Sequence, residues 1–149
     1  MPYEALISQY PHIKIKEVTN LPRGLAGLYL DNEIRIDKYR SKYEKHGILA
    51  EEFGHYETSH GDIVDLSHIQ NMKLEVIARR WGYKKIVPLD KLIECYIKDY
   101  TTLEEVCEHL EITSNYLQTS LNYYKDRHGL FVLRKNFKIS FDPLNVERC

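Results

Sequence analysis

The chain has 149 residues, 43% hydrophobic and 29% charged, with a formal net charge of −1. This length suffices for one compact core with a small appended segment, and the near-neutral charge gives no general attraction to nucleic acid or anionic lipid. No apolar run approaches the roughly 18–20 residues of a transmembrane helix, and the first residues lack the basic and apolar regions of a signal peptide, so we expect a cytoplasmic protein without a membrane partner.

The three cysteines, Cys95, Cys107 and Cys149, are odd in number and widely separated. This pattern argues against a disulfide framework and against a cysteine-rich zinc site. We expect small packing residues and one exposed thiol at the C-terminus.

The N-terminal part is expected to contain a short helix within residues 1–16, followed by a β-hairpin over residues 25–36. The turn falls at Asp31-Asn32, where two residues that tolerate a left-handed backbone stand together. The apolar positions that flank this turn are Leu28, Leu30, Ile34 and Ile36.

A helix is expected from Ser41 to about Thr58. Ser41 is a good N-cap, and Glu44, three residues on, completes the spacing of a capping box. Apolar residues at helical spacing follow, so the segment is expected to pack against the core.

This helix carries the most informative motif of the chain, Glu51-Glu52-Phe53-Gly54-His55. It matches the H-E-x-x-H pattern of zinc peptidases, except that glutamate stands in the first histidine position. Glu51 and His55 are four residues apart and share one face of a helix, and Glu52 lies about 100° round from Glu51. Two side chains can thus hold an ion while the adjacent carboxylate accepts a proton from the attacking water.

The competing interpretation is an ordinary solvated pair of glutamates with a histidine one turn away. Apolar neighbours on both sides of the acidic pair favour a helix that carries its charges into the protein, namely Ile48, Leu49, Phe53 and Tyr56. Buried carboxylates need partners or a metal.

Residues 59–71 lack periodicity and are expected to form a loop, and a second helix is expected over residues 72–85, before Pro88. A catalytic ion needs a third protein ligand. We favour Glu75, because Ala78 one turn on would let the two helices approach closely; His60 and Asp62 in the loop are the alternatives. Two pairs of basic residues in this helix are expected on its solvated face: Arg79 and Arg80, and Lys84 and Lys85.

The remaining chain is expected to form helices closed by a hairpin of residues 130–133 and 137–141. Residues 103–117 have the spacing of a helix-turn-helix, with Thr113 or Ser114 as the cap of its second helix. Residues 114–124 contain no lysine or arginine, although a DNA-reading helix needs cations. Nucleic acid is therefore an improbable partner, and we expect these helices to pack on the core.

Three blocks of this sequence resemble successive blocks of the ImmA/IrrE family of metallopeptidases, in the same order and at similar spacing. They are Gly24-Leu25-Ala26-Gly27-Leu28-Tyr29-Leu30-Asp31, Leu49-Ala50-Glu51-Glu52-Phe53-Gly54-His55-Tyr56 and Glu75-Val76-Ile77-Ala78-Arg79-Arg80-Trp81, followed by Pro88.

The resemblance implies an α+β fold with a zincin-like metallopeptidase core over residues 1–90, which contains a small antiparallel sheet and two active-site helices. Residues 91–149 would form the C-terminal helical segment closed by a hairpin. The implied activity is that of a metal-dependent endopeptidase, which cleaves a helix-turn-helix repressor or another regulatory protein of a phage or mobile element.

Carried across position by position, the resemblance assigns the metal ligands to Glu51, His55 and Glu75 and the general base to Glu52. Zinc is the expected metal, with manganese as the alternative because carboxylate oxygens shift preference toward harder ions. Histidine at position 51 would bind zinc more tightly than glutamate, unless the carboxylate is matched to a partner of its own.

Two other functions are compatible with the same sequence. One is a catalytically silent relative that binds a repressor or host protein in the same groove without cleaving it. The other is a DNA-binding regulator, which the charge pattern of residues 114–124 opposes.

Overall fold

The computed structural model describes residues 2–58 and 68–149, and for residues 68–72 it describes the backbone only. The chain is α+β and divides into two compact units, Met1–Lys85 and Ile86–Cys149. The sequence predicts the boundary after residue 90, whereas the structure places it after Lys85. Val87 and Asp90 belong to the second unit because both form hydrogen bonds with residues of that unit. There, the Tyr124 hydroxyl donates to the Val87 carbonyl at 2.8 Å, and Arg134 pairs with Asp90.

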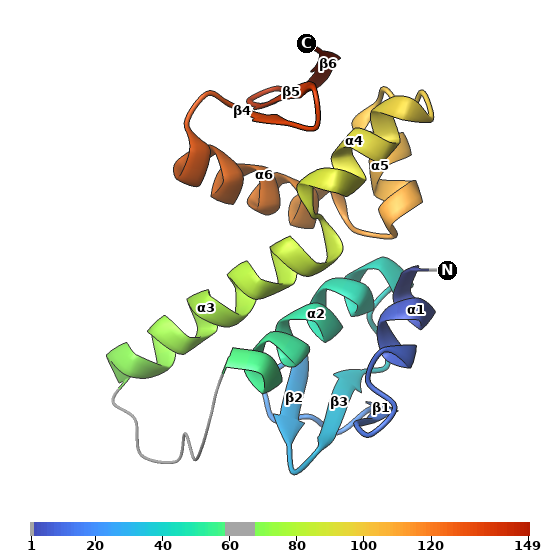
Figure 1. Ribbon diagram of the computed structural model, residues 1–149. Coiled ribbons are helices and arrows are strands. Elements are labelled where there is room, and N and C mark those ends of the chain that lie inside the picture. The colour runs from blue at the N-terminus through green and yellow to red at the C-terminus, as the bar shows by residue number, and fades with distance from the viewer. Residues whose placement is uncertain (1, 59–67) are drawn as a thin grey trace. The chain divides into compact units, whose positions relative to one another are not determined.

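The first unit consists of a three-stranded sheet covered by helices (Figure 1). Helix α1 (Pro2–Ser8) precedes the strands β1 (Lys14–Val18), β2 (Gly27–Leu30) and β3 (Glu33–Asp37), and helix α2 (Lys42–Thr58) packs on β2 and β3. The core between sheet and helices is formed by side chains with no exposed surface, among them Ile34, Ile36, Leu49 and Phe53.

The sheet has the order β1-β3-β2, with β2 antiparallel and β1 parallel to β3. The predicted hairpin is confirmed, but β1 was not predicted, so the sheet is mixed and not purely antiparallel. The sequence of β1, Lys-Ile-Lys-Glu-Val, is largely polar and exposed, and therefore gives little hydrophobic signal.

The hairpin turns at Asp31 and Asn32, both with positive φ (52° and 60°), as expected for a two-residue loop. This turn pairs Tyr29 with Ile34 and Leu30 with Glu33. Directly paired residues lie on the same face of a sheet, so Leu28 and Leu30 cannot share the buried face of Ile34. The four apolar residues that flank the turn therefore lie on both faces of the hairpin, and Leu30 is 63% exposed.

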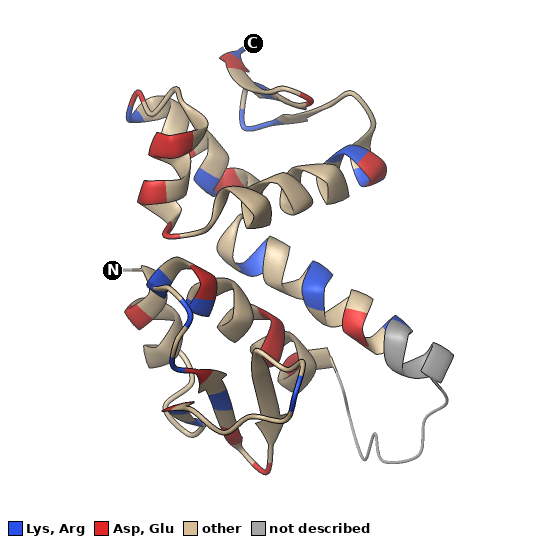
Figure 2. Cartoon of the chain, turned by 180° about the vertical axis from the view of Figure 1, so that it is seen from behind, with Lys and Arg blue, Asp and Glu red and all other residues tan. Residues whose placement is uncertain are grey.

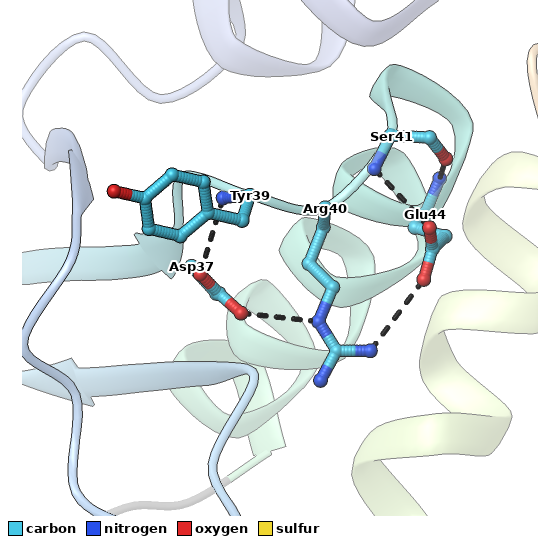
Figure 3. Close-up of polar contacts among 5 residues, drawn as sticks. All are labelled: Asp37, Tyr39, Arg40, Ser41 and Glu44. Carbon is cyan, nitrogen blue, oxygen red and sulfur yellow. Dashed lines mark hydrogen bonds and ion pairs between the residues drawn. The ribbon is translucent and has the colours of Figure 1, made fainter.

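The start of α2 is fixed by the predicted capping box (Figure 3). The Glu44 backbone N–H donates to Ser41 Oγ, and the Ser41 N–H donates to Glu44 Oε1, both at 3.2 Å. Arg40 bridges Asp37 at the end of β3 to Glu44 on the helix. The contacts therefore tie the beginning of the motif-bearing helix to the sheet.

Helix α3 (His68–Ile86) begins before the predicted residue 72 and ends next to the predicted residue 85. It crosses α2 where Gly54 meets Ala78: a Cβ at Gly54 would overlap the Ala78 carbonyl, and Ala78 is fully buried. The prediction that Ala78 permits a close approach is confirmed. Most of the expected loop, residues 59–67, lies outside the described residues.

The second unit contains the helices α4 (Leu89–Ile97), α5 (Leu103–Leu110) and α6 (Ser114–His128), followed by the strands β4 (Phe131–Arg134), β5 (Phe137–Phe141) and β6 (Leu144–Arg148). The helix-turn-helix spacing is confirmed. Thr113 caps α6 through the Tyr116 N–H, and Glu111 between the helices has a left-handed backbone. The predicted hairpin is confirmed as β4 and β5, but a third strand, β6, pairs antiparallel with β5 and was not predicted.

The cysteines are as expected: Cys95 and Cys107 are buried, Cys149 is exposed, and all three are free. Burial raises the pKa of the Cys95 thiol to about 11, which makes this thiol unreactive at neutral pH. Across residues 2–58 and 68–149, no helix combines the length and apolarity needed to span a membrane.

Candidate metal centre

Helices α2 and α3 bring three potential metal ligands together in the first unit. Glu51 and His55 project from α2 and Glu75 from α3, and one donor atom of each lies within 4.8 Å of the others. His55 Nε2 and Glu75 Oε1 are 3.3 Å apart. These are the three residues that the sequence singled out as ligands.

The helix crossing explains why these side chains meet. Glu51 precedes Gly54 by about one helical turn, and Glu75 precedes Ala78 by the same number of residues. Because Gly54 and Ala78 are in backbone contact, the turns that carry Glu51 and Glu75 lie on adjoining faces. The absence of a Cβ at Gly54 is thus a requirement of the site.

Glu52 lies on the sheet side of the ligands, beside β2. Its side chain is almost completely buried, with 8% of the residue exposed, and its Oε2 would lie 3.1 Å from a Cβ at Gly27. Burial, together with the charges of Glu51 and Glu75, raises the pKa of Glu52 to about 8, although a hydrogen bond from the Tyr29 backbone N–H opposes the shift. Such a carboxyl group can accept and return a proton near neutral pH.

Glu51 is the less buried of the two neighbouring carboxylates. Burial raises the pKa of Glu51, while the guanidinium of Arg79 opposes the shift. The Arg79 Nε lies 2.7 Å from Glu51 Oε1, and its Nη2 lies 3.9 Å from Glu75 Oε2. Arg79 was expected on the solvated face of α3. That expectation is incomplete, because the side chain is half exposed yet pairs with two ligand residues.

The three side chains line a cleft of about 550 Å³. One wall is the segment that leads into β2 together with the strand itself, residues 24–29, and the other is formed by Ile48, Leu74 and Arg79 around the acidic residues. A cleft of this volume accommodates several residues of an extended peptide.

The donor set fits a divalent transition metal. Two carboxylates and one imidazole are ordinary zinc ligands and leave a coordination position open. Donor atoms around a tetrahedral zinc ion lie about 3.4 Å apart, so small side-chain rotations, above all of the exposed Glu75, suffice to close the 4.8 Å spread seen here. The set does not itself distinguish zinc from manganese.

The alternative third ligands, His60 and Asp62, lie outside the described residues. Comparisons with protein-family models, curated proteins and solved structures gave no match. The assignment of this centre therefore depends on the geometry of the chain itself.

Helix α6, the second helix of the helix-turn-helix, carries no lysine or arginine before its last turn. Figure 2 shows α6 without charged residues until its C-terminal end, where Lys125, Asp126 and Arg127 lie in the last turn. The N-terminal turns of a DNA-reading helix normally contact base edges and phosphates. The charge distribution on α6 thus does not resemble such a surface.

Proposed function

We propose that this protein is a metal-dependent endopeptidase of the ImmA/IrrE type, with a zincin-like core formed by the first unit. The observation that carries the proposal is the meeting of Glu51, His55 and Glu75 at the helix crossing, with the buried Glu52 next to them. Three ligands with an open position and one adjacent carboxyl group form the minimum apparatus of metal-assisted amide hydrolysis.

When bound, a divalent cation supplies the Lewis acidity that polarises the scissile carbonyl and acidifies water. Glu52 accepts the proton of the attacking water and returns it to the leaving amine. Burial raises the pKa of Glu52 to about 8, so this carboxyl group can hold the accepted proton until the leaving amine takes it.

The cleft gives the substrate a place to bind in extended form. β2 is an edge strand of the sheet and lines the cleft beside the acidic residues. The free edge of a strand can pair with a peptide through backbone hydrogen bonds. We propose a cytoplasmic regulatory protein as the substrate, a helix-turn-helix repressor by resemblance, which would present an extended segment to this edge.

The experiment that tests the proposal is the metal content of the purified protein. We expect one divalent transition metal per chain, and its loss or strong reduction in Glu51→Ala, His55→Ala and Glu75→Ala. Glu57→Ala, which removes an exposed carboxylate from the same helix, is the matched control and should retain the metal. Equal metal content in all five proteins would overturn the assignment.

A second candidate function, a binding protein that uses the cleft without cleavage, is favoured by one observation. The candidate ligand side chains pair with one another or with a neighbour, His55 with Glu75 and Glu51 with Arg79. Their charges are therefore partly compensated by the protein itself. Incubation of the metal-loaded protein with a bound regulatory protein distinguishes the two functions. Intact partner after prolonged incubation supports the binder, and defined fragments in mass spectrometry support the peptidase.

A further inference from the structure

Arg79 is the one basic side chain, among the lysines and arginines that the structure describes, that lines the cleft at the candidate metal centre. Among the described residues that line the cleft, three are acidic and Arg79 alone carries a permanent positive charge. Its position follows from the sequence, since Arg79 lies one turn after Glu75 on α3 and so shares a face with it.

The contacts of Arg79 are directed mainly to Glu51. Nε donates to Glu51 Oε1 at 2.7 Å, a short charge-assisted hydrogen bond, whereas the approach to Glu75 is longer, at 3.9 Å. The bond engages one carboxylate oxygen of Glu51, so the second oxygen remains for another cation. The side chain of Glu51 is 25% exposed and that of Arg79 is 55% exposed, which leaves both reachable from the cleft.

The charges explain why such a partner is needed at this position. A neutral imidazole adds no charge to a metal centre, whereas a glutamate adds −1. The guanidinium adds +1, so the sum of Glu51 and Arg79 is zero, as for one neutral histidine. The pair therefore leaves the electrostatic balance around a dication the same as in a centre with histidine at position 51.

We propose that Glu51 and Arg79 act as one unit in place of a histidine ligand, with Glu51 as the ligand and Arg79 as the positioning residue that orients it and neutralises its charge. This inference rests on the proposed metal site. Arg79 would then belong to the metal centre through its bond to Glu51, without being a ligand itself.

The proposal has a consequence for the exchange of Glu51 by histidine. A metal-ligating imidazole needs an acceptor for its second ring N–H, but a guanidinium has donors only. In Glu51→His the two groups would face each other without an acceptor, with one excess positive charge. Glutamine at position 79 would remove this charge and supply a carbonyl acceptor.

A double-mutant cycle of zinc affinity tests the proposal in the full-length protein. The four proteins are the wild type, Glu51→His, Arg79→Gln and the double variant, titrated against a chromophoric zinc chelator at one pH. We expect each single variant to bind zinc about 10–100-fold more weakly, the usual effect of losing a partner of a ligand. The double variant should recover to within about tenfold of the wild type. Lys84→Gln, the same change of charge further along α3, is the matched control and should leave the affinity unchanged.

The outcomes separate this inference from the proposed function. A wild type that binds no zinc or manganese overturns the metal site itself. Zinc binding in the wild type with single effects that multiply in the double variant, or unchanged or tighter binding in either single variant, overturns the pairing. If Glu51→His does not fold, judged by circular dichroism, the cycle is run with Glu51→Gln. This variant also removes the main carboxylate partner of Arg79, and its effect on affinity should shrink when Arg79→Gln is present.

Discussion

Glu52 is more deeply buried than the other acidic residues that line the cleft, Glu51 and Glu75. It is buried against β2, accepts the Tyr29 backbone N–H, and lies beside two further carboxylates. A carboxylate in such a position is costly unless a cation is nearby. Its chemistry is therefore expected to depend on an ion that Glu51, His55 and Glu75 would hold.

We predict that Glu52→Gln retains the metal and loses cleavage. The amide preserves the shape of the side chain, but it cannot accept the proton of the attacking water, and loss of general-base catalysis typically lowers the rate by about 10²–10⁴-fold. Metal content and the rate of cleavage of a natural protein substrate are measured in parallel, with Glu57→Gln as the control. Cleavage at the wild-type rate would show that another group is the base.

Single residues of the site could be identified from the sequence to the extent that helical spacing defines them. Glu51, Glu52 and His55 were recognised because one helix sets their mutual positions, and Glu75 because a small residue one turn on indicated a helix contact. Arg79 was missed, although its spacing of four residues from Glu75 was a usable signal. The sequence places Arg79, Arg80, Lys84 and Lys85 together on a solvated face, and only the packing of α3 against α2 decides which of them meets a carboxylate of the other helix.

At the scale of elements, the crossing of α2 and α3 links stability to the site. Gly54 is in contact with the Ala78 backbone, and the same contact sets the separation of Glu51 from Glu75. Any side chain at position 54 must push the helices apart.

We predict that Gly54→Ala destabilises the protein and weakens metal binding together. In a helix interior this exchange normally stabilises by about 1 kcal/mol, so the sign is diagnostic. Here the added methyl group overlaps the Ala78 carbonyl, and overpacking of this kind typically costs about 1–3 kcal/mol. Urea unfolding with and without zinc measures both effects. A stabilised variant with unchanged zinc affinity would show that the helices do not meet at this glycine.

A second prediction at this scale concerns the contact of α4 with the turn after β4. Arg134 donates to both oxygens of Asp90 at 2.6 and 3.1 Å, and these hydrogen bonds, together with Lys135, lower the pKa of Asp90 to about 2. A carboxyl group with a lowered pKa in the folded state stabilises above its ordinary pKa, and the contribution is lost as pH falls towards 2.

We therefore expect Asp90→Asn to be less stable than the wild type at pH 7, by no more than about 1 kcal/mol for so exposed a pair. The difference should shrink between about pH 4 and pH 2. Thermal unfolding over that range measures it, with Asp126→Asn as the control. A difference that is independent of pH would mean that Asp90 acts through something other than its charge.

The elements themselves could be predicted wherever the sequence carried a strong local signal. The capping box of Ser41 and Glu44, the helix-turn-helix and both hairpin turns were recognisable, because each depends on a few adjacent residues. β1 and β6 were missed because both are short, polar edge strands that become strands only by pairing with β3 and β5. Leu30 is exposed because the register of the two-residue turn pairs it with Glu33 and not with Ile34.

At the scale of the whole molecule, the candidate ligands belong to one unit. Glu51, His55 and Glu75 lie within Met1–Lys85, and Ile86–Cys149 has a core of its own that includes Leu92 and Ile139. An ion at this site joins two helices of the first unit that the sequence separates by an intervening segment. Such a link stabilises the folded chain by mass action, because the unfolded chain does not preserve the site.

We predict that zinc raises the thermal stability of the wild type and that manganese does so more weakly. At a free metal concentration of about 100 times the dissociation constant, the gain is about 2.7 kcal/mol, or about 5–10 °C in unfolding temperature for a chain of this size. Differential scanning calorimetry with a chelator, zinc or manganese measures it, with His55→Ala as the variant that should lose the shift. An equal rise in the wild type and in His55→Ala would place the ion elsewhere, and a larger rise with manganese than with zinc would show that the two carboxylates, and not the imidazole, decide which metal the centre prefers.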